Sequence, residues 1–395
     1  MSQPGVVIVG AGQGGLQAAI SLRQDGYAGP VTLIGAEPGL PYQRPPLSKA
    51  YLAEGDAAAL VLRPESFFAS KDITYLPSTT VEAIDRAARQ VALSGPSAPA
   101  RLDYDRLILA TGTRNLRPRI DGLERALDLR TLADAGRLRE VLASPRRVAV
   151  IGGGFIGLEF AAAARKLGHE VAVIEAADRL MARVVSPLMS RYFAMLHHEW
   201  GTQVHLGQPA VRVNEDSVGL ADGTQIAADT VLLAAGVCPN TELAEAAGLV
   251  IENGIRLDAH LRTSDPAIFA LGDCASFPDP RSGRQVRLES VQAATDHARL
   301  IAAQIAKGAD AAYAAVPWFW SDQGDRKLQI AGLAGPDATE EILADGIVAR
   351  VDAIGVAALE TVNNAGAHMK ARRLLTGHAP VALDEMAAAV LKTAA

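Results

Sequence analysis

The chain of 395 residues is poor in cysteine and in aromatic residues. Its two cysteines, Cys238 and Cys274, form no CxxC pair, cannot supply four ligands to an iron–sulfur cluster, and give no disulfide framework of the secreted type. The eight histidines are scattered, without HExxH or Cys/His spacing. The adjacent pair His197–His198 is not expected to bind metal, because neighbouring helical side chains diverge. We therefore expect no metal site.

An excess of basic charge and long apolar runs are also missing. The formal net charge is −6, whereas a nucleic-acid-binding chain normally carries a basic excess. No apolar run reaches the roughly 18 to 20 residues of a membrane span. The chain enters a strand at Val6, with no leader-type segment before it. We therefore expect a cytoplasmic protein that binds neither nucleic acid nor membrane.

An internal repeat of strand, glycine-rich loop and helix is the main positive signal. The first copy consists of the strand 6–9, the loop GAGQGG at 10–15, a helical stretch from Leu16 and a buried strand at 31–34. The second consists of the strand 148–151, the loop GGGFIG at 152–157, an alanine-rich helix from Leu158 and a buried strand at 171–174. Each copy closes with a later strand that runs into glycine, LILATG at 107–112 and VLLAAG at 231–236.

Each glycine loop is typical of a dinucleotide site. The first glycine of GxGxxG allows a tight turn, the second lets the backbone approach a pyrophosphate, and the third lets helix and strand pack closely. The helix N-terminus then offers free N–H groups and a positive dipole end to the phosphates. The repeat therefore predicts dinucleotide contacts from Gly10, Gly12, Gly14, Gly15, Ala110, Thr111, Gly112, Gly152, Gly154, Phe155, Ile156, Gly157 and Gly236.

An acidic residue follows the second strand of each copy and is suited to bind ribose hydroxyls. Glu175 lies 23 positions after Gly152, close to the expected spacing of about 20, whereas Glu37 lies 27 positions after Gly10. The alternative is that both are solvated strand-end residues. Two sites imply a tightly held FAD and an exchangeable nicotinamide. Glu175 would repel a 2′-phosphate, which favours NADH over NADPH, and the basic residues that could change this preference are Arg179 and Arg183.

Seven short motifs connect the chain to a known family: PYQRPPLSK at 41–49, ATG at 110–112, GGGFIGLE at 152–159, TSDP at 263–266, GDCA at 272–275, ESV at 289–291 and PWFWSDQ at 317–323. With these motifs the chain resembles, almost end to end, the putidaredoxin reductase-like family of bacterial FAD-dependent NADH:ferredoxin reductases. These enzymes serve haem-thiolate (cytochrome-type) monooxygenase systems and aromatic-ring dioxygenases. Gly324 departs from the family pattern, in which a tyrosine usually follows Ser-Asp-Gln.

The resemblance implies an α/β fold with two Rossmann-like dinucleotide-binding domains, as in the glutathione-reductase-like flavoproteins, and a C-terminal α+β domain. The FAD-binding domain would be discontinuous, built from 1–112 and 241–316. The NADH-binding domain would span 113–240, and the C-terminal domain 317–395.

The resemblance also implies roles for a proline-rich loop and two later residues. Arg44, followed by Pro46, would contact FAD phosphates, and Lys49 would reach the flavin ring, where a cation favours reduced flavin. Glu159 would approach both Lys49 and the nicotinamide carboxamide, and Trp320 would line the electron exit. We take these three, Lys49, Glu159 and Trp320, as catalytic candidates. The prolines are expected to exclude helix from the loop.

Plainer alternatives stand beside these roles. The loop can be an ordinary basic surface loop, Glu159 an acid that complements the dipole of the first helical turn, and Trp318 and Phe319 parts of a core strand. Further FAD contacts implied by the resemblance are Asp273 beside Gly272, Ser290 and Val291 at a helix start, and, less specifically, Val81 and Arg130.

The resemblance implies that a [2Fe–2S] ferredoxin accepts the electrons. It is expected to be a separate protein, because the two cysteines of this chain cannot hold that cluster. It would dock near the C-terminal domain, and the candidate basic contacts are Arg326, Lys327, Lys370, Arg372 and Arg373. Disulfide reductases and peroxidase-type relatives are excluded, because the loop at 41–49 lacks their cysteine. A rubredoxin reductase or an NADH oxidase of the same fold remains an alternative. A redox-sensing nucleic-acid-binding flavoprotein is disfavoured by the pI of about 5.8.

Overall fold

The computed structural model describes residues 4–377 and 379–391, which form two units. The first unit consists of three segments: the described residues up to Gln43, then Ala58–Arg114 and Cys238–Ala315. The second consists of Arg44–Ala57, Asn115–Val237 and the chain from Val316 onward. The chain crosses from one unit to the other near β7 (Thr113–Asn115) and β15 (Val237–Pro239), which pair with each other. The segment Arg44–Ala57 therefore belongs with residues from Asn115 onward, although 57 residues of the first unit lie between them in the sequence.

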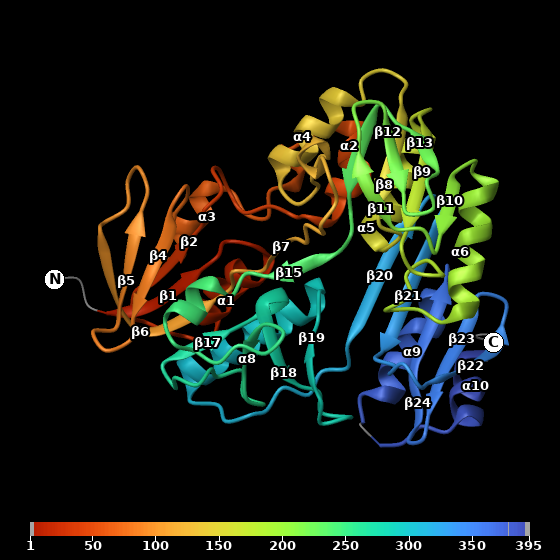
Figure 1. Ribbon diagram of the computed structural model, residues 1–395. Coiled ribbons are helices and arrows are strands. Elements are labelled where there is room, and N and C mark those ends of the chain that lie inside the picture. The colour runs from red at the N-terminus through yellow and green to blue at the C-terminus, as the bar shows by residue number, and fades with distance from the viewer. Residues whose placement is uncertain (1–3, 378, 392–395) are drawn as a thin grey trace. The chain divides into compact units, whose positions relative to one another are not determined.

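The first unit is built on a parallel sheet that continues into an antiparallel extension (Figure 1). Its strands are β1 (Gly5–Val9), β2 (Val31–Ile34), β3 (Ile73–Leu76), β4 (Thr80–Asp85), β5 (Gln90–Ser94), β6 (Arg101–Leu109) and β17 (Ile268–Ala270). The order is β3-β2-β1-β6-β5-β4, and β17 pairs in parallel with the end of β6. Strands β1 and β2 are buried along their whole length, which explains why almost all of their residues are apolar.

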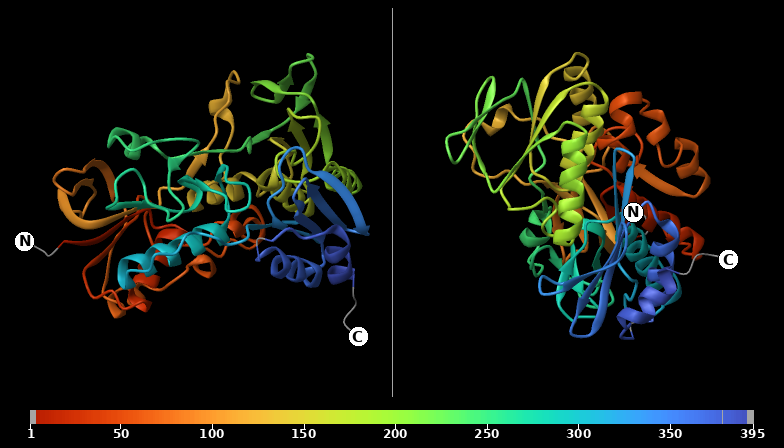
Figure 2. Two further views of the ribbon diagram at one scale, coloured as in Figure 1. Left: turned by 90° about the horizontal axis from the view of Figure 1, so that it is seen from below. Right: turned by 90° about the vertical axis from the view of Figure 1, so that its right-hand side faces the viewer.

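Helices cover this sheet and position the first glycine loop. Helix α8 (Val291–Lys307) packs along α1 (Gln13–Gln24) (Figure 1, Figure 2). The smaller elements of the unit are η2 (Ala58–Leu60), α3 (Glu65–Ser70), α7 (Glu242–Ala246), β16 (Ile255–Arg256), η4 (Gly272–Cys274), β18 (Ala275–Pro278) and β19 (Gln285–Arg287). Strands β16, β18 and β19 form a separate sheet.

The second unit contains a four-stranded parallel sheet that repeats the first architecture. Its strands are β8 (Arg147–Ile151), β9 (Glu170–Glu175), β10 (Gln203–Leu206) and β14 (Thr230–Leu233), in the order β10-β9-β8-β14. Helices α4 (Leu132–Val141), α5 (Phe155–Lys166) and α6 (Pro187–Glu199) accompany it, with η3 (Leu123–Arg125) and an antiparallel sheet of β11 (Ala210–Val213), β12 (Ser217–Leu220) and β13 (Gln225–Ala227).

The expectation that the prolines at 45 and 46 exclude helix from the loop is wrong. They start a 3₁₀ turn, η1 (Pro45–Ser48), which α2 (Ala50–Glu54) follows. Proline is tolerated at this position because the first N–H groups of a helix have no intrahelical acceptor. Both elements contact α4, and both also contact α5.

The end of the chain forms a five-stranded antiparallel sheet with two helices on it (Figure 1). Its strands are β20 (Trp318–Gln323), β21 (Arg326–Gly332), β22 (Thr339–Ala344), β23 (Ile347–Asp352) and β24 (Gly355–Val362), in the order β20-β21-β24-β23-β22. Helices α9 (Ala365–Leu375) and α10 (Leu383–Leu391) bury their apolar residues against this sheet, among them Ala371 and Met386.

Buried charges join this sheet to the start of α6. The Glu360 carboxylate, 1% exposed, accepts hydrogen bonds from the backbone N–H (2.8 Å) and the hydroxyl (2.6 Å) of Ser186, the residue that caps α6. Arg350 lies 3.4 Å from the same carboxylate. A second carboxylate, that of Glu340, accepts from the N–H of Leu188 at 2.8 Å. The otherwise unpaired N–H groups of the helix start are therefore bound by acids, which the helix dipole also favours.

In the described part of the chain, the helices are all too short or too polar to cross a bilayer.

Candidate functional site

The first glycine loop has the backbone geometry that a dinucleotide requires. Gly10 has φ +109°, and a side chain there would collide with the carbonyl oxygen of Ala110. A side chain at Gly15 would collide with the carbonyl oxygen of Gly10, and one at Gly14 with Leu271. Gly12, in contrast, faces open space, with no atom within 4 Å of an added Cβ. A ligand can therefore approach the backbone at Gly12 closely.

The second glycine loop repeats this pattern at its first, third and sixth positions. Gly152 has φ +115° and lies against the carbonyl oxygen of Ala234, and Gly157 lies against that of Gly152. Gly154 again faces open space. Gly12 and Gly154 are the N-caps of α1 and α5, and neither helix has a side-chain cap or an acidic residue in its first turn. Both helix starts therefore fit the pyrophosphate of a dinucleotide.

The acid of the second copy lies directly at its glycine loop. One oxygen of Glu175 accepts from the N–H of Gly153 (2.7 Å) and the other from the N–H of Ala177 (2.8 Å). Phe155 and Ile156 begin α5, and Ile156 stays exposed. The guanidinium of Arg183 lies about 3.5 Å from the point where Gly236 would carry a Cβ. In the first copy, Glu37 accepts a hydrogen bond from the hydroxyl of Tyr42.

The Arg179 guanidinium is hydrogen-bonded to backbone carbonyl oxygens of its own loop. Its guanidinium donates to the carbonyl oxygens of Ala182 (2.6 Å) and Val185 (2.9 Å) and to the hydroxyl of Ser190 (2.9 Å). Arg179, a residue that could change the preference for NADH, therefore already has three hydrogen-bond acceptors.

Lys49 and Glu159 form a buried ion pair within the second unit. The Lys49 Nζ lies 3.1 Å from Oε1 of Glu159 and 3.3 Å from Oδ2 of Asp322. Glu159 is the fifth residue of α5 and is 7% exposed. The alternative that it merely complements the dipole of the first turn therefore does not fit its position or its burial.

Three further donors surround the Glu159 carboxylate. The Ser48 hydroxyl donates to Oε2 at 2.7 Å, and Oε1 accepts from the Ser321 hydroxyl (2.9 Å) and from the N–H of Asp322 (3.2 Å). Burial raises the pKa of Glu159, and the Lys49 charge and the two hydroxyl donors oppose this rise. No role was expected for Ser48, Ser321 or Asp322, although all three lie inside the motifs that carry the resemblance.

In the first unit, several of the remaining candidates directly follow β6 and β17. The Asp273 carboxylate accepts from the Thr113 hydroxyl at 3.3 Å, and Gly272 has φ +70°. Thr111 exchanges two hydrogen bonds with Asn240, at 2.7 and 2.8 Å. Ser290 caps α8 by accepting from the N–H of Ala293, and Val291 begins that helix. Val81 lies in β4, and Ala110 and Gly112 adjoin Thr111.

The buried His297 supports the backbone at Gly272. This role of His297 was not predicted from the sequence. Nδ1 of His297 accepts from the N–H of Gly272 at 3.3 Å, and its ring packs edge-on against Phe277 and Tyr313. Burial lowers the pKa of His297 to about 3, so the ring stays neutral and able to accept.

The other candidates lie in the second unit. Arg44 donates to the carbonyl oxygen of Arg130 at 2.6 Å, and Pro46 lies in η1. The rings of Trp318 and Trp320 are 5.4 Å apart, and the Arg372 guanidinium lies 4.6 Å from the Trp318 ring centre. Trp318, Phe319 and Trp320 are all half-buried in β20. Among the basic candidates, Arg326 pairs with Asp325, Lys327 lies 3.9 Å from Asp322, and Arg373 is exposed.

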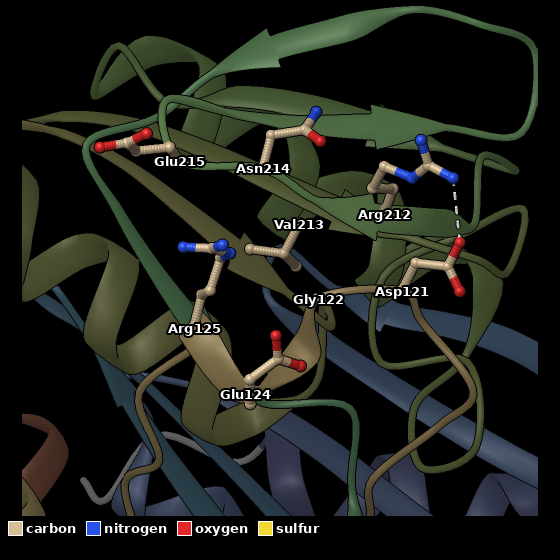
Figure 3. A pocket seen from close by; sticks show the side chains of 8 residues that line it. All are labelled: Asp121, Gly122, Glu124, Arg125, Arg212, Val213, Asn214 and Glu215. Atoms are coloured by element: carbon tan, nitrogen blue, oxygen red, sulfur yellow. Dashed lines mark hydrogen bonds and ion pairs between the residues drawn. The ribbon is translucent and has the colours of Figure 1, made fainter.

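One open cavity of about 310 Å³ lies elsewhere in the second unit (Figure 3). It is lined by Asp121, Gly122, Glu124, Arg125, Arg212, Val213, Asn214 and Glu215. Two of its charged groups, Asp121 and Arg212, pair with each other at 3.0 Å. It includes none of the candidate residues. Within residues 4–377 and 379–391, no group of three or more His, Cys, Asp or Glu side chains is arranged to hold a metal ion.

Two protein-family models together cover most of the chain. The pyridine nucleotide-disulphide oxidoreductase model matches residues 4–298, and the reductase C-terminal model matches residues 318–395. The chain therefore belongs to the pyridine nucleotide-disulphide oxidoreductases, flavoproteins that bind FAD and NAD(H). Within them it belongs to the putidaredoxin reductase-like ferredoxin reductases, as individual relatives show.

Rhodocoxin reductase from Rhodococcus erythropolis is 44% identical over 97% of this chain and 92% of that protein. Putidaredoxin reductase from Pseudomonas putida is 40% identical over 95% and 92%. The ferredoxin reductase of the CYP199A2 system from Rhodopseudomonas palustris superposes with a TM-score of 0.91 at 42% identity, covering 98% and 97%. The covalent putidaredoxin reductase–putidaredoxin complex gives the same TM-score at 38% identity, covering 98% and 96%. The predicted family, fold, oxidoreductase class and cofactors FAD and NAD are confirmed.

Proposed function

We propose that this chain takes electrons from NADH through bound FAD and passes them singly to a separate [2Fe–2S] ferredoxin of an oxygenase system. The observation that carries the proposal is the second glycine loop, which repeats the first at its three GxGxxG glycines, combined with a C-terminal region that matches the reductase C-terminal model. FAD supplies the conversion between a two-electron donor and a one-electron acceptor. The relatives named for putidaredoxin and rhodocoxin support this kind of partner.

The chain's own residues bind and orient the two dinucleotides. Gly10, Gly12 and Gly15, with the start of α1, are proposed to bind FAD phosphates. The start of α5 is proposed to bind those of NADH. Each Glu175 oxygen has about two lone pairs and uses one on backbone N–H, so it can still accept from a ribose hydroxyl. NADH is preferred because Glu175 repels a 2′-phosphate and Arg179 is already bound to backbone.

Lys49 and Glu159 are proposed to act on the reacting rings. The Lys49 ammonium favours uptake of negative charge by the flavin, and Glu159 accepts a hydrogen bond from the nicotinamide carboxamide. Pairing at 3.1 Å lets each balance the other's charge in a buried setting. No protein acid or base has to transfer a proton to the nicotinamide, because holding the donor in place is sufficient.

The domain assignment and the docking region remain proposals. We propose FAD binding by 1–112 and 241–316, NADH binding by 113–240 and acceptor docking near 317–395, with Trp320 at the electron exit. The extent of the reductase C-terminal model, residues 318–395, supports a distinct final domain. Exposed Arg373 is a candidate contact for an acidic ferredoxin. A cytoplasmic location agrees with a reaction that consumes NADH, and cell fractionation tests it.

The test is a panel of electron acceptors supplied to the purified flavoprotein with NADH or NADPH. We expect rapid, NADH-dependent reduction of at least one [2Fe–2S] ferredoxin, well above oxygen consumption without acceptor. Faster reduction of a rubredoxin, or turnover that oxygen alone explains, would reassign the enzyme to one of the two alternatives. A purified protein that does not bind FAD would remove the proposal altogether.

A further inference from the structure

Glu159 lies at one end of a row of buried polar side chains. The row runs from His197 on α6 through Gln323 and Ser321 on β20 to Glu159 on α5, and all four belong to the second unit. Nε2 of His197 is 3.0 Å from Oε1 of Gln323, Nε2 of Gln323 is 3.2 Å from Oγ of Ser321, and that oxygen is 2.9 Å from Oε1 of Glu159. His197, Gln323 and Ser321 are 0% exposed.

The hydrogen atoms along this row can be assigned from chemistry. An ionised carboxylate only accepts, so Ser321 gives its single hydrogen to Glu159. The Ser321 oxygen then accepts from the amide NH₂ of Gln323. This orientation turns the Gln323 carbonyl toward His197, which must therefore donate from Nε2. Every hydrogen in the row points toward Glu159.

The local fold holds this row in place. Ser321 and Gln323 are two positions apart on β20, so both point to the same face. The His197 ring packs edge-on against Trp200, with ring centres 5.1 Å apart. Gly324 has no side chain where a Cβ would lie 2.9 Å from Cζ2 of Trp200. The missing side chain at 324 therefore leaves room for the ring that packs on His197.

Four donors contact the Glu159 carboxylate in this arrangement. A carboxylate has about four lone-pair positions. Ser321, the N–H of Asp322 and Lys49 contact Oε1, whereas Ser48 alone contacts Oε2, so Oε2 keeps a position for the nicotinamide carboxamide. If the Ser321 hydroxyl turned toward Gln323, Glu159 would lose one donor while remaining buried, and its ionised form would be less favourable.

We infer that Gln323, oriented by His197, is a positioning residue for the nicotinamide, because it commits the Ser321 hydroxyl to Glu159. It touches no cofactor and acts only through Ser321. The inference rests on the proposed function, since it takes Glu159 as the group that meets the carboxamide. The row thus keeps the carboxylate ionised and fixes its direction for the incoming NADH.

The test compares the binding of NAD⁺ with that of ADP-ribose, which lacks the nicotinamide, to the purified flavoprotein by calorimetry. Ser321→Ala is expected to weaken NAD⁺ about tenfold, as loss of a hydrogen bond to a charged group implies. Gln323→Leu, of similar volume, is expected to weaken NAD⁺ about threefold. Both variants should leave ADP-ribose affinity within about twofold. Equal weakening of the two ligands would mean a merely structural role and would overturn the inference.

The double variant separates action through Ser321 from independent effects. Because Gln323 acts only through Ser321, adding Gln323→Leu to Ser321→Ala should cause no further loss of NAD⁺ affinity. Additive losses would overturn the inference. Thr202→Val is the matched control: this hydroxyl is also buried beside His197 but has no hydrogen-bond partner among the described residues, and its removal should change neither affinity.

A measurement on the unmodified protein avoids reliance on variants that fold poorly. Nitrogen NMR of histidine-labelled protein is expected to show His197 neutral, with its proton on Nε2. A proton on Nδ1 instead would contradict the row. Neither measurement uses an electron acceptor, so a failed ferredoxin assay and a failed positioning test remain distinguishable.

Discussion

The Glu360–Arg350 pair gives a quantitative test of how the final sheet is stabilised. In Glu360→Leu, the guanidinium of Arg350 loses its carboxylate while its side chain is only 9% exposed. Breaking a buried pair in this way costs about 3–5 kcal/mol. For a large unit, the dependence of unfolding free energy on urea lies near the upper end of about 1–3 kcal/mol per M. The unfolding midpoint should therefore fall by roughly 1–2 M.

Tryptophan fluorescence follows this unfolding selectively. All three tryptophans, Trp200, Trp318 and Trp320, belong to the second unit, so their emission reports on it and not on the first. Glu341→Gln on the same sheet is the control, since this side chain is exposed and should leave the midpoint unchanged.

The double variant Glu360→Leu with Arg350→Met tests the reason for the loss. Removing both charges should restore most of the stability, because no buried charge is left unpaired. The N–H and hydroxyl of Ser186 would still lack their acceptor, so a deficit of about 1–3 kcal/mol should remain. A double variant as unstable as the single one, or a single variant within about 0.3 M of the parent, would refute the reasoning.

Three further outcomes are expected. Gly154→Ala should keep the fold, because its Cβ meets open space, but should weaken NAD⁺ binding at least tenfold by calorimetry, whereas Gly157→Ala should also destabilise the unit. Burial lowers the pKa of His297 from 6.5 to about 3, so only the unfolded chain takes up a proton here as the pH falls through 6.5. The free energy of unfolding therefore falls by up to about 1.4 kcal/mol per pH unit down to about pH 3. In His297→Phe, the free energy of unfolding should depend less steeply on pH over this range. Replacing Glu175 by Ala should raise kcat/KM for NADPH relative to NADH by about tenfold or more in steady-state assays, since like-charge contacts cost several kcal/mol.

The glycine loops could be predicted in detail because their signal is local. A tight turn, a clear approach and a close helix contact each require glycine at a fixed spacing, and the structure has all three twice. The position of Glu175 at its loop follows from strand length in the same way.

The partners of Glu159 could not be predicted, because they come from distant parts of the chain. Ser48 lies 111 positions before Glu159, and Ser321 lies 162 positions after it. A hydroxyl carries no sequence signal that it will meet a particular carboxylate. The same holds for His297, whose role depends on packing beneath Gly272, and for the 3₁₀ turn at Pro45–Ser48, where proline is compatible with a helix start.

The discontinuity of the first unit also affects how the protein is made. Strand β6 receives its neighbour β17 only after some 160 further residues have been synthesised, and α1 waits still longer for α8. During translation, β6 therefore emerges from the ribosome long before its partner strand exists. During that interval the nascent chain exposes an unpaired, apolar strand edge, which favours aggregation. We therefore expect the chain to associate with a chaperone during synthesis.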